Sequence, residues 1–226
     1  MAAYSRGTST NIIVGAAAIF VADSTLDPSA ASGATQILPF LQSESYKSTL
    51  SADPDYTNVG YTMNGLELTF TPDFGEVAVD QVLDVAKLYK QGMQVSLATA
   101  FAEATLENLL LATAGKESAL TGVATTSVGR TLQLSAGDIG EVPLERGIVA
   151  VGPGTGDGNK SDSMERVYIG YRALSIEAVT VSAKREEASM FEVSFRMLPD
   201  DTTATYGKIV DRTFYDGSGT NYRTAS

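Results

Sequence analysis

The sequence predicts a mainly β protein that carries one helix. Apolar and polar residues alternate along several short stretches, which is the pattern of strands with one buried face. Pro, Asp, Asn and Gly separate these stretches, as they do at turns. A helical spacing of apolar residues is clear in one segment, residues 103–114. The 226 residues are 43% hydrophobic, which is enough for a sizeable core, and we treat residues 1–226 as a single domain.

The composition excludes several kinds of chemistry. The chain has no Cys and no His, so disulfides, thiol nucleophiles, Cys–His metal sites and Ser-His-Asp triads are impossible. Its 16 Lys and Arg against 27 Asp and Glu give a net charge of −11. Such a chain repels a phosphate backbone, so we do not expect it to clamp nucleic acid, although DNA can pass it without being held.

The N-terminal quarter begins with an arm and ends with a loop. Residues 1–10 are small and polar and predict an N-terminal arm. The apolar run that follows, residues 11–22, predicts a strand, although its alanines also suit a helix. It is too short for a membrane span and lacks the layout of a signal peptide, so we expect a protein made and kept in the cytoplasm until it is assembled or released. Residues 23–57, rich in Ser, Ala, Asp and Pro, predict a long loop.

The stretch GLELTFTPDFGEVAVDQ, residues 65–81, predicts a hairpin with two unlike faces. Pro72, Asp73 and Gly75 supply the chemistry of a turn. The predicted apolar face consists of Leu66, Leu68, Phe70, Val77 and Val79. The polar and acidic face consists of Glu67, Thr69, Thr71, Glu76, Ala78 and Asp80.

Residues 81–115 contain an ambiguous piece, a strand and the helix. Residues 81–91 suit either a helix or a strand. Residues 93–101 alternate again, and one side of this strand consists of Gln94, Ser96, Ala98 and Ala100. Within residues 103–114, one helical face carries Leu106, Leu109, Leu110 and Thr113, and Gly115 supplies a stop. A single amphipathic helix among strands must cover an open side of a sheet.

The second half repeats the strand pattern. Strands are predicted at residues 131–134, 148–151, 166–172, 176–183 and 191–198. The Gly-rich stretch 152–163 predicts a flexible loop between two of them. From residue 199 the chain turns polar and predicts a C-terminal arm, residues 199–226, whose removal should leave the protein folded.

The Gly-rich loop fits no strong ligand motif. The G-x-G-x-x-G pattern fails because its last position is Asp157, and a P-loop would need Gly and Lys side by side. Calcium could use the oxygens of Asp157, Asn159, Ser161 and Asp162. The EF-hand pattern nevertheless lacks Gly at its sixth position and Glu at its twelfth. A plain hairpin loop is therefore favoured, and no cofactor or metal is predicted.

The acidic side chains of the hairpin suggest an acid site at first. Glu67, Glu76 and Asp80 share the predicted polar face, and acid hydrolases use two carboxylates on facing positions. Their neighbours are Thr and Ala, however, and not the aromatic platforms that bind sugars. A solvated polar face is favoured, so we predict no catalytic residue and a structural or binding role.

Three motifs in a fixed order point to a family. EVAVDQ ends a strand, VSLATAFAEATLENL joins a strand to a helix, and LPDD precedes GKIVDR late in the chain. Together they span most of residues 58–214. Their order is similar to that in the major tail tube proteins of long-tailed bacteriophages.

The resemblance implies a β-sandwich or barrel core with one flanking helix. It also implies long hairpins that join neighbouring subunits into a ring-shaped β-barrel. Six copies would form a ring, and stacked rings would form the virion tail tube through which genome DNA enters the host. The implied partners are further copies of the chain, a tape-measure protein, a tail terminator and tail-tip proteins. DNA would pass without sequence-specific binding, and no membrane is implied.

Under this resemblance, residues 58–101 form part of the tube wall. The candidate lumen-facing residues are Glu67, Thr69, Thr71, Glu76, Ala78, Asp80, Gln94, Ser96, Ala98 and Ala100, with Glu177 and Glu192 on the late strands as additions. The candidates for packing against the core or helix are Leu66, Leu68, Phe70, Val77, Val79, Leu106, Leu109 and Leu110. Residues 1–10, 23–57 and 199–226 are the candidates for contacts between rings.

Three other interpretations stay open. A decoration protein, or the tube subunit of a contractile injection machine, shares this composition. An outer-membrane barrel also has two-faced strands, but it would need a signal peptide and aromatic girdles. A carbohydrate hydrolase would need aromatic sugar platforms beside its carboxylates, and the predicted polar face has Thr and Ala there.

Overall fold

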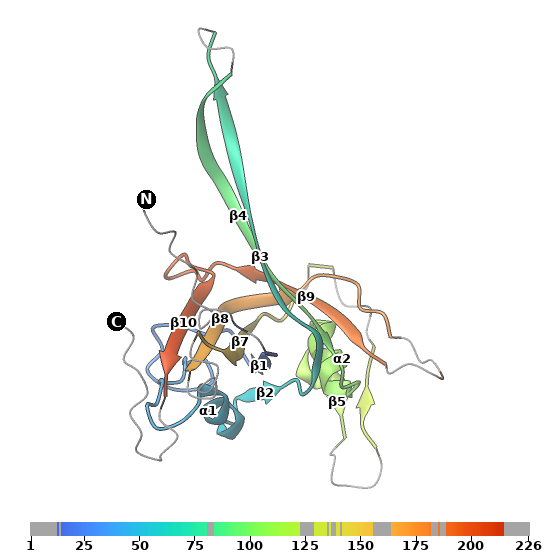
Figure 1. Ribbon diagram of the computed structural model, residues 1–226. Coiled ribbons are helices and arrows are strands. Elements are labelled where there is room, and N and C mark those ends of the chain that lie inside the picture. The colour runs from blue at the N-terminus through green and yellow to red at the C-terminus, as the bar shows by residue number, and fades with distance from the viewer. Residues whose placement is uncertain are drawn as a thin grey trace.

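The computed structural model describes residues 13, 15–80, 84–122, 129–134, 136, 139–140, 142–155, 164–181, 185 and 189–214. Within these residues the protein is mainly β, with a large antiparallel sheet and two α-helices (Figure 1), which confirms the predicted class. A body holds the helices and most strands, and one long hairpin projects from it.

Eight strands form the large sheet. In its order they are β2 (Tyr56–Asn58), β1 (Ala18–Ala22), β7 (Arg146–Pro153), β8 (Met164–Ser175), β9 (Phe191–Leu198), β4 (Val85–Phe101) and β3 (Thr62–Ala78), with β10 (Gly207–Thr213) also paired to β8. A separate small pair joins β5 (Leu120–Thr121) to β6 (Thr131–Leu132). The order begins at β2 and ends at β3, so the described strands of one chain do not close into a barrel.

β8 is the strand at which the sheet divides. Its first half, Met164–Gly170, pairs with β10, whereas Arg172–Ser175 pair with β9 along the same edge. The two branches diverge, and residues of β1 meet residues of β4 and β9 in one hydrophobic core. That core contains Ile19, Val21, Val95, Leu97, Phe101, Ile148, Val193 and Phe195. The curled sheet therefore encloses its main core between its own two ends.

Each helix covers one hydrophobic core. α2 (Leu106–Ala112) contributes Leu111 and Ala112 to the core between the two branches. α1 (Tyr46–Ala52) contributes Tyr46 and Leu50 to a second core on the other side of β7 and β8. Burial raises the pKa of the Tyr46 hydroxyl well above its ordinary value. That hydroxyl donates a hydrogen bond to a backbone carbonyl instead of ionising.

The start of each helix has a specific capping residue. The Thr105 hydroxyl accepts a hydrogen bond from the Asn108 backbone N–H, which satisfies one of the free donors at the first turn of α2. The buried Asn108 side chain then donates to the backbone carbonyls of Val59 and Glu103. α2 is thereby attached to the segment that leads into the hairpin.

The start of α1 rests on a buried ion pair. The Glu165 carboxylate accepts hydrogen bonds from the Ser45 hydroxyl at 2.6 Å and from the Tyr46 backbone N–H at 2.7 Å. Its charge is matched by Arg212 of β10, whose Nη1 lies 2.5 Å from Oε1 of Glu165. Arg212 also donates to the Leu41 carbonyl, and its guanidinium lies over the Phe40 ring. One ion pair thus joins β8, β10, α1 and the preceding loop.

Several predicted elements differ from the structure. The predicted loop 23–57 contains α1 and ends in β2, because Tyr46 and Leu50 find a core that is remote in sequence. The predicted arm 199–226 is part of the fold as far as residue 214, since β10 pairs with β8. Residues 176–181 form no strand; β8 instead continues to Ser175. Residues 1–10 and 156–163, including the candidate calcium oxygens, lie outside the described residues.

The buried face of the helix also differs from the predicted one. Asn108, Leu110, Leu111 and Ala112 are buried, whereas Leu106 and Leu109 are half-buried and Thr113 is exposed. The apolar run Leu109–Leu111 fits two overlapping helical faces, and packing against the core favours the one that includes Asn108. Leu110 is buried as predicted and Leu109 packs against the main core as predicted, whereas Leu106 and Thr113 differ from the predicted face.

Removal of Arg212 tests the buried pair. Arg212→Ala leaves the Glu165 carboxylate buried without its cation, which should lower the free energy of unfolding by about 3–5 kcal/mol. Arg166→Ala is the matched control, because Arg166 also pairs across β8 and β10, with Asp211, but at an exposed site. That control should lose less than about 1 kcal/mol. Equal losses in denaturant unfolding of the two variants would contradict the assignment.

Candidate functional site on the projecting hairpin

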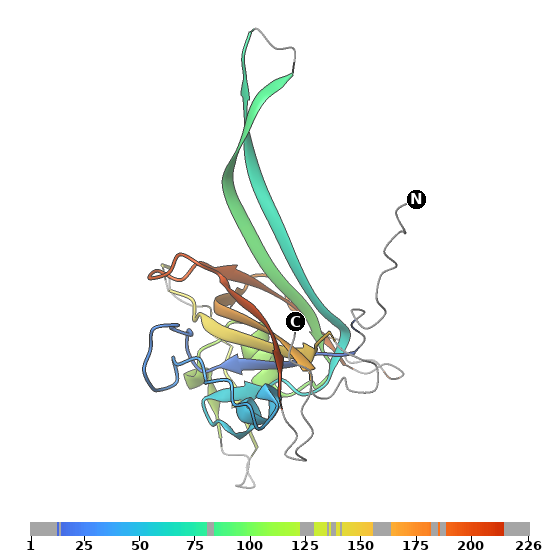
Figure 2. The same cartoon turned by 60° about the vertical axis from the view of Figure 1, so that its left-hand side comes forward.

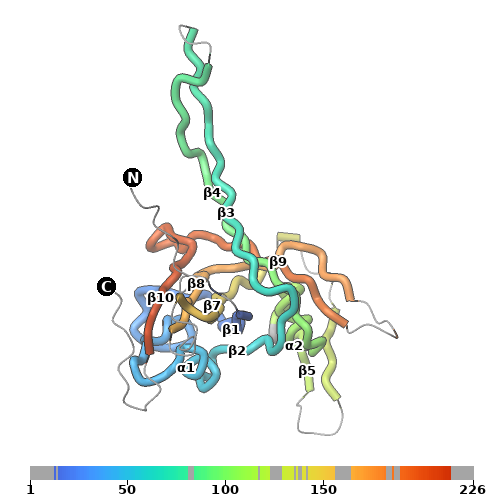
Figure 3. Tube along the Cα trace, in the orientation of Figure 1, coloured from blue at the N-terminus to red at the C-terminus, as the bar shows by residue number. Residues whose placement is uncertain are grey.

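The hairpin of β3 and β4 is the feature that a self-contained fold would not need. Each strand has 17 residues. The β4 residues that pair with β9 are Val95–Phe101, so the strands are anchored to the body at their roots. The residues of β4 that precede Val95, and the part of β3 that pairs with them, leave the body as a two-stranded ribbon. Figure 2 shows this ribbon from another side, and Figure 3 shows it as a tube along the Cα trace. Isolated two-stranded ribbons are marginally stable in water, which makes this extension unusual.

The predicted turn at Pro72–Gly75 is wrong. β3 runs through these residues, with Pro72 opposite Met93 and Gly75 opposite Tyr89. Proline is tolerated here because β3 is the last strand of the sheet and its outer edge needs no ladder N–H. The chain instead reverses between Ala78 and Val85. The ambiguous piece 81–91 accordingly supplies the first residues of β4 and no helix in its described part.

This change of turn divides the predicted polar face between two sides. The register places Glu67 opposite Ala98, Thr69 opposite Ser96 and Thr71 opposite Gln94, so these six residues share one side as predicted. We call them the polar face. Successive residues of a strand point to opposite sides. The pairing has two register shifts between Leu66 and Ala78, but each adds its extra residue to β4, so the alternation of β3 continues through this span. Glu76 and Ala78 therefore lie on the opposite side, and Asp80 lies beyond the strand.

Ala100 is also misplaced by the prediction. It is 2% exposed, because the root of β4 is already enclosed by β3 and β9 at this level. It cannot line an open surface of this chain. The remaining members of the polar face are accessible: Glu67, Thr69, Thr71 and Gln94 are exposed, and Ser96 and Ala98 are half-buried.

The apolar side is covered at its root and uncovered further out. Leu66 and Leu68 pack against the main core, as predicted. Phe70 is 52% exposed and Val77 and Val79 are each 39% exposed, so their predicted core packing is wrong within one chain. Phe74 and Leu88 on the same ribbon are 54% and 59% exposed. Phe70 and Phe74 share the side of Leu68, which leaves an aromatic stripe with no cover of its own.

Late strands extend the polar face at the root. Glu67, Glu177 and Glu192 line one shallow depression of about 240 Å³, together with Ala98 and Ser194. The two late glutamates therefore lie beside the polar face, although Glu177 follows β8 and is not in a strand. Sequence reasoning missed Arg196, which β9 places opposite Ser96. The alternation of β9 around Glu192 was the signal for it. Arg196 thus places a cation beside the glutamates of this depression.

Gly75 has a specific reason to be in the exposed ribbon. Its position is buried, because the Tyr89 ring of the opposite strand lies where a Cβ would stand, 2.5 Å from Cζ. The Tyr89 hydroxyl accepts a hydrogen bond from the Gln91 side chain. An aromatic ring that covers a cross-strand glycine fixes the register of a ribbon. The register shifts on either side of this pair make such fixing necessary.

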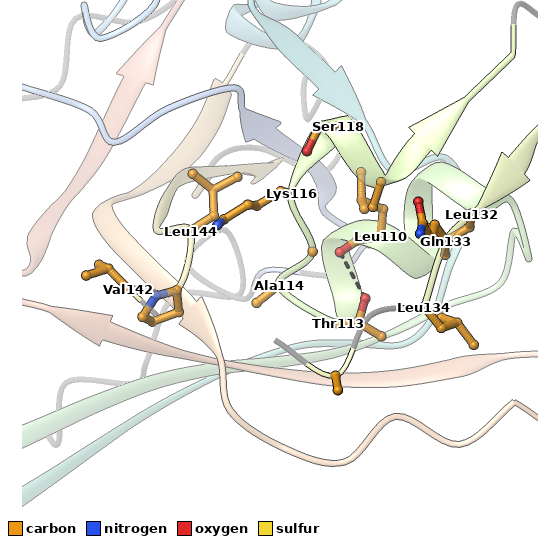
Figure 4. Close-up of a pocket in the computed structure, with 14 residues that line it drawn as sticks. Leu110, Thr113, Ala114, Lys116, Ser118, Leu132, Gln133, Leu134, Val142 and Leu144 are labelled. Carbon is orange, nitrogen blue, oxygen red and sulfur yellow. Dashed lines mark hydrogen bonds between the residues drawn. The ribbon is translucent and has the colours of Figure 1, made fainter. Parts of the chain in front are cut away.

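A second concavity offers no catalytic chemistry. A pocket of about 530 Å³ lies between the end of α2 and residues 132–134, 136 and 142–144 (Figure 4). Its lining is largely aliphatic, and Lys116 is the one ionisable side chain among the described residues that line it. Leu134 and Val142 at its rim are 86% and 77% exposed. The pocket therefore has no pair of ionisable groups for acid–base work among the described residues that line it.

Within the described part of the chain, no three carboxylates are placed to hold a metal ion. No described helix is long and apolar enough to cross a bilayer. Neither the protein-family models nor the curated proteins compared with this chain contain a match.

Truncation of Tyr89 tests how the ribbon is held. Tyr89→Ala uncovers Gly75 and should weaken the ribbon by up to about 1 kcal/mol, the scale of one cross-strand pair. Hydrogen exchange of the amides from Phe70 to Ala78 should accelerate, while the melting temperature of the body stays unchanged. Leu88→Ala is the matched control, because Leu88 is similarly exposed and covers no glycine. The interpretation fails if both variants accelerate exchange equally.

Proposed function

We propose that this chain is a structural subunit that polymerises through its projecting hairpin into a tube, the major tail tube protein of a long-tailed phage. One observation carries the proposal: a hairpin of two 17-residue strands leaves the body as a ribbon with one polar and one apolar face, and beyond its root neither face is covered. A ribbon of this kind is completed by its neighbours. The resemblance of the motif order to tail tube proteins gives the form of the assembly.

The backbone of the ribbon supports pairing between copies. β3 ends the sheet, so its outer edge has no strand partner in the described residues. Residues 85–94 of β4 lack one on their outer edge as well, because pairing with β9 begins at Val95. Two open edges on one ribbon are complementary to those of the next copy, and a closed ring of ribbons leaves none. Six copies per ring is what the family resemblance implies.

The two faces of the ribbon assign the inside and the outside of the tube. The aromatic stripe of Phe70 and Phe74 would pack against the bodies of neighbouring subunits. Each half-exposed ring would contribute about 1 kcal/mol when covered. The polar face would then line a water-filled channel. Glu67 and Glu192 would repel a phosphate backbone, so that DNA passes without being held.

The remaining assignments follow from the same proposal. Copies of the chain are the main partner, and a tape-measure protein would occupy the channel before ejection. Tail terminator and tail-tip proteins would close the two ends. The protein would be found in the virion tail, and in the host cytoplasm during assembly. It would not be an enzyme.

Electron microscopy of the concentrated protein tests the proposal. We expect long hollow rods from the full chain. A shortened variant, in which an Asn-Gly turn joins Asp73 directly to Gly92, should keep its melting temperature because it retains Leu68 and Val95 of the core. It should remain monomeric at every concentration.

A surface control separates the hairpin from general stickiness. Leu134→Ser with Ile139→Ser removes two fully accessible aliphatic side chains far from the hairpin and should leave the rods intact. Rods from the shortened variant, or compact particles without a channel from the full chain, would overturn the proposal. The second result would favour a decoration protein.

A further inference from the structure

A groove at the root of the hairpin has no occupant in the single chain. It lies between the apolar side of the ribbon and the strands β8 and β10, with a volume of about 440 Å³. Its apolar lining includes Leu68, Phe70, Met93, Tyr168, Tyr206 and Ile209. The Tyr206 hydroxyl donates a 2.5 Å hydrogen bond to the Met93 carbonyl, which fixes the ribbon to the body beside the groove. The groove is therefore a built part of the fold.

Two lysines line this apolar groove. The Lys90 ammonium lies 3.4 Å from the Met93 sulfur, which is a weak acceptor. Lys208 is exposed at the border of the groove, and its ammonium lies 5.7 Å from the centre of the Phe40 ring, which is outside the groove lining. Neither lysine has a carboxylate within ion-pair distance among the described residues. Two unneutralised cations are unexpected in a chain with a net charge of −11.

An apolar groove with two cations fits an aliphatic segment that carries carboxylates. The tip of the hairpin has this chemistry: Glu76 and Asp80 flank Val77 and Val79 in the sequence EVAVD. All four side chains are exposed, and both valines are 39% accessible. We call residues 76–80 the acidic tip.

The acidic tip cannot reach the groove of its own chain. Ala78 is ten residues beyond Leu68 along β3, a span of about 33 Å at the rise of a strand. The ribbon extends away from the body over this length (Figure 1). Its acceptor must therefore belong to another molecule.

We propose that the acidic tip of one copy docks in the lysine-lined groove of a neighbouring copy. This inference rests on the proposed function, because it names the contact that orders the subunits. A protrusion and a groove on different parts of one chain make a head-to-tail contact that continues from copy to copy. Lys90 and Lys208 pair with the tip carboxylates, and the valines cover Ile209 and Met93.

The pocket beside α2 is a weaker acceptor for the tip. Its single lysine, Lys116, is already engaged in an interaction within the chain. A tip docked there would bring at least two carboxylates to an aliphatic wall without free cations, and unpaired carboxylates are costly to desolvate.

Cross-linking between two single-cysteine variants tests the contact, because the natural chain has no cysteine to interfere. Val79→Cys marks the tip, and Ile209→Cys marks the groove; both side chains are exposed, so folding is preserved. With a short bismaleimide, the mixture should give a covalent dimer that neither variant gives alone. Val79→Cys mixed with Leu134→Cys is the control for the pocket beside α2 and should give none.

Each result separates the two proposals. The groove contact would be overturned if rods form but the mixture of Val79→Cys and Ile209→Cys gives no dimer. It would also be overturned if Val79→Cys forms a dimer with Leu134→Cys instead. In both cases the tube proposal would stand. A tip–groove dimer without rods would support the contact and overturn the tube. If the protein forms no rods and the mixture gives no dimer, both proposals are overturned.

Charge reversal provides an independent test. Lys208→Glu and Asp80→Lys should each reduce the polymerised fraction in sedimentation, and the two changes in one chain should restore it. Lys47→Glu, at an exposed position on α1, should have no effect. Equal loss in Lys208→Glu and Lys47→Glu would contradict the contact, because both changes lower the net charge by two and only Lys208 lines the groove.

Discussion

The constraint on which the structure depends is the pleat of a strand that extends beyond its own sheet. β3 and β4 are ordinary sheet strands at their roots, where Leu68 and Val95 are held by the main core. Further out the same alternation continues without a second layer. The alternation therefore places polar groups on one side of the ribbon and exposed aromatic rings on the other. The backbone at both edges of the ribbon has no strand partner in the described residues. Folding of one chain covers the root of the ribbon and leaves the rest of it exposed.

The body serves this ribbon as a rigid anchor. β4 is shared between the hairpin and the core, and β9 fixes its root through seven paired residues. The curled sheet, α2 and the Tyr206 hydrogen bond to Met93 hold the ribbon at a defined direction. On the far side, the ion pair of Glu165 and Arg212 joins the late strand β10 to α1. The root of the ribbon is consequently held to the body by backbone pairing, core packing and a side-chain hydrogen bond.

Several features of the site could be predicted from the sequence. Alternation places Glu67, Thr69 and Thr71 on one side, and the later strand contributes Gln94, Ser96 and Ala98 to the same side. The error came from Pro72–Gly75, which has turn composition but lies in an edge strand where proline is allowed. A strand through that point instead of a turn reverses the side of every later residue, so Glu76 and Ala78 were assigned to the wrong face.

The sequence by itself determined the β class, the helix near residue 110, the absence of thiol and imidazole chemistry and the two-faced character of the hairpin. These depend on residue type and on periods of two or 3.6, which are local properties. The tertiary structure decided where the chain reverses, which leucines α2 buries and that residues 207–213 belong to the sheet. It alone placed Arg196 beside the polar face and two lysines along one groove. Those outcomes depend on pairing between residues far apart in the chain, which no local pattern encodes.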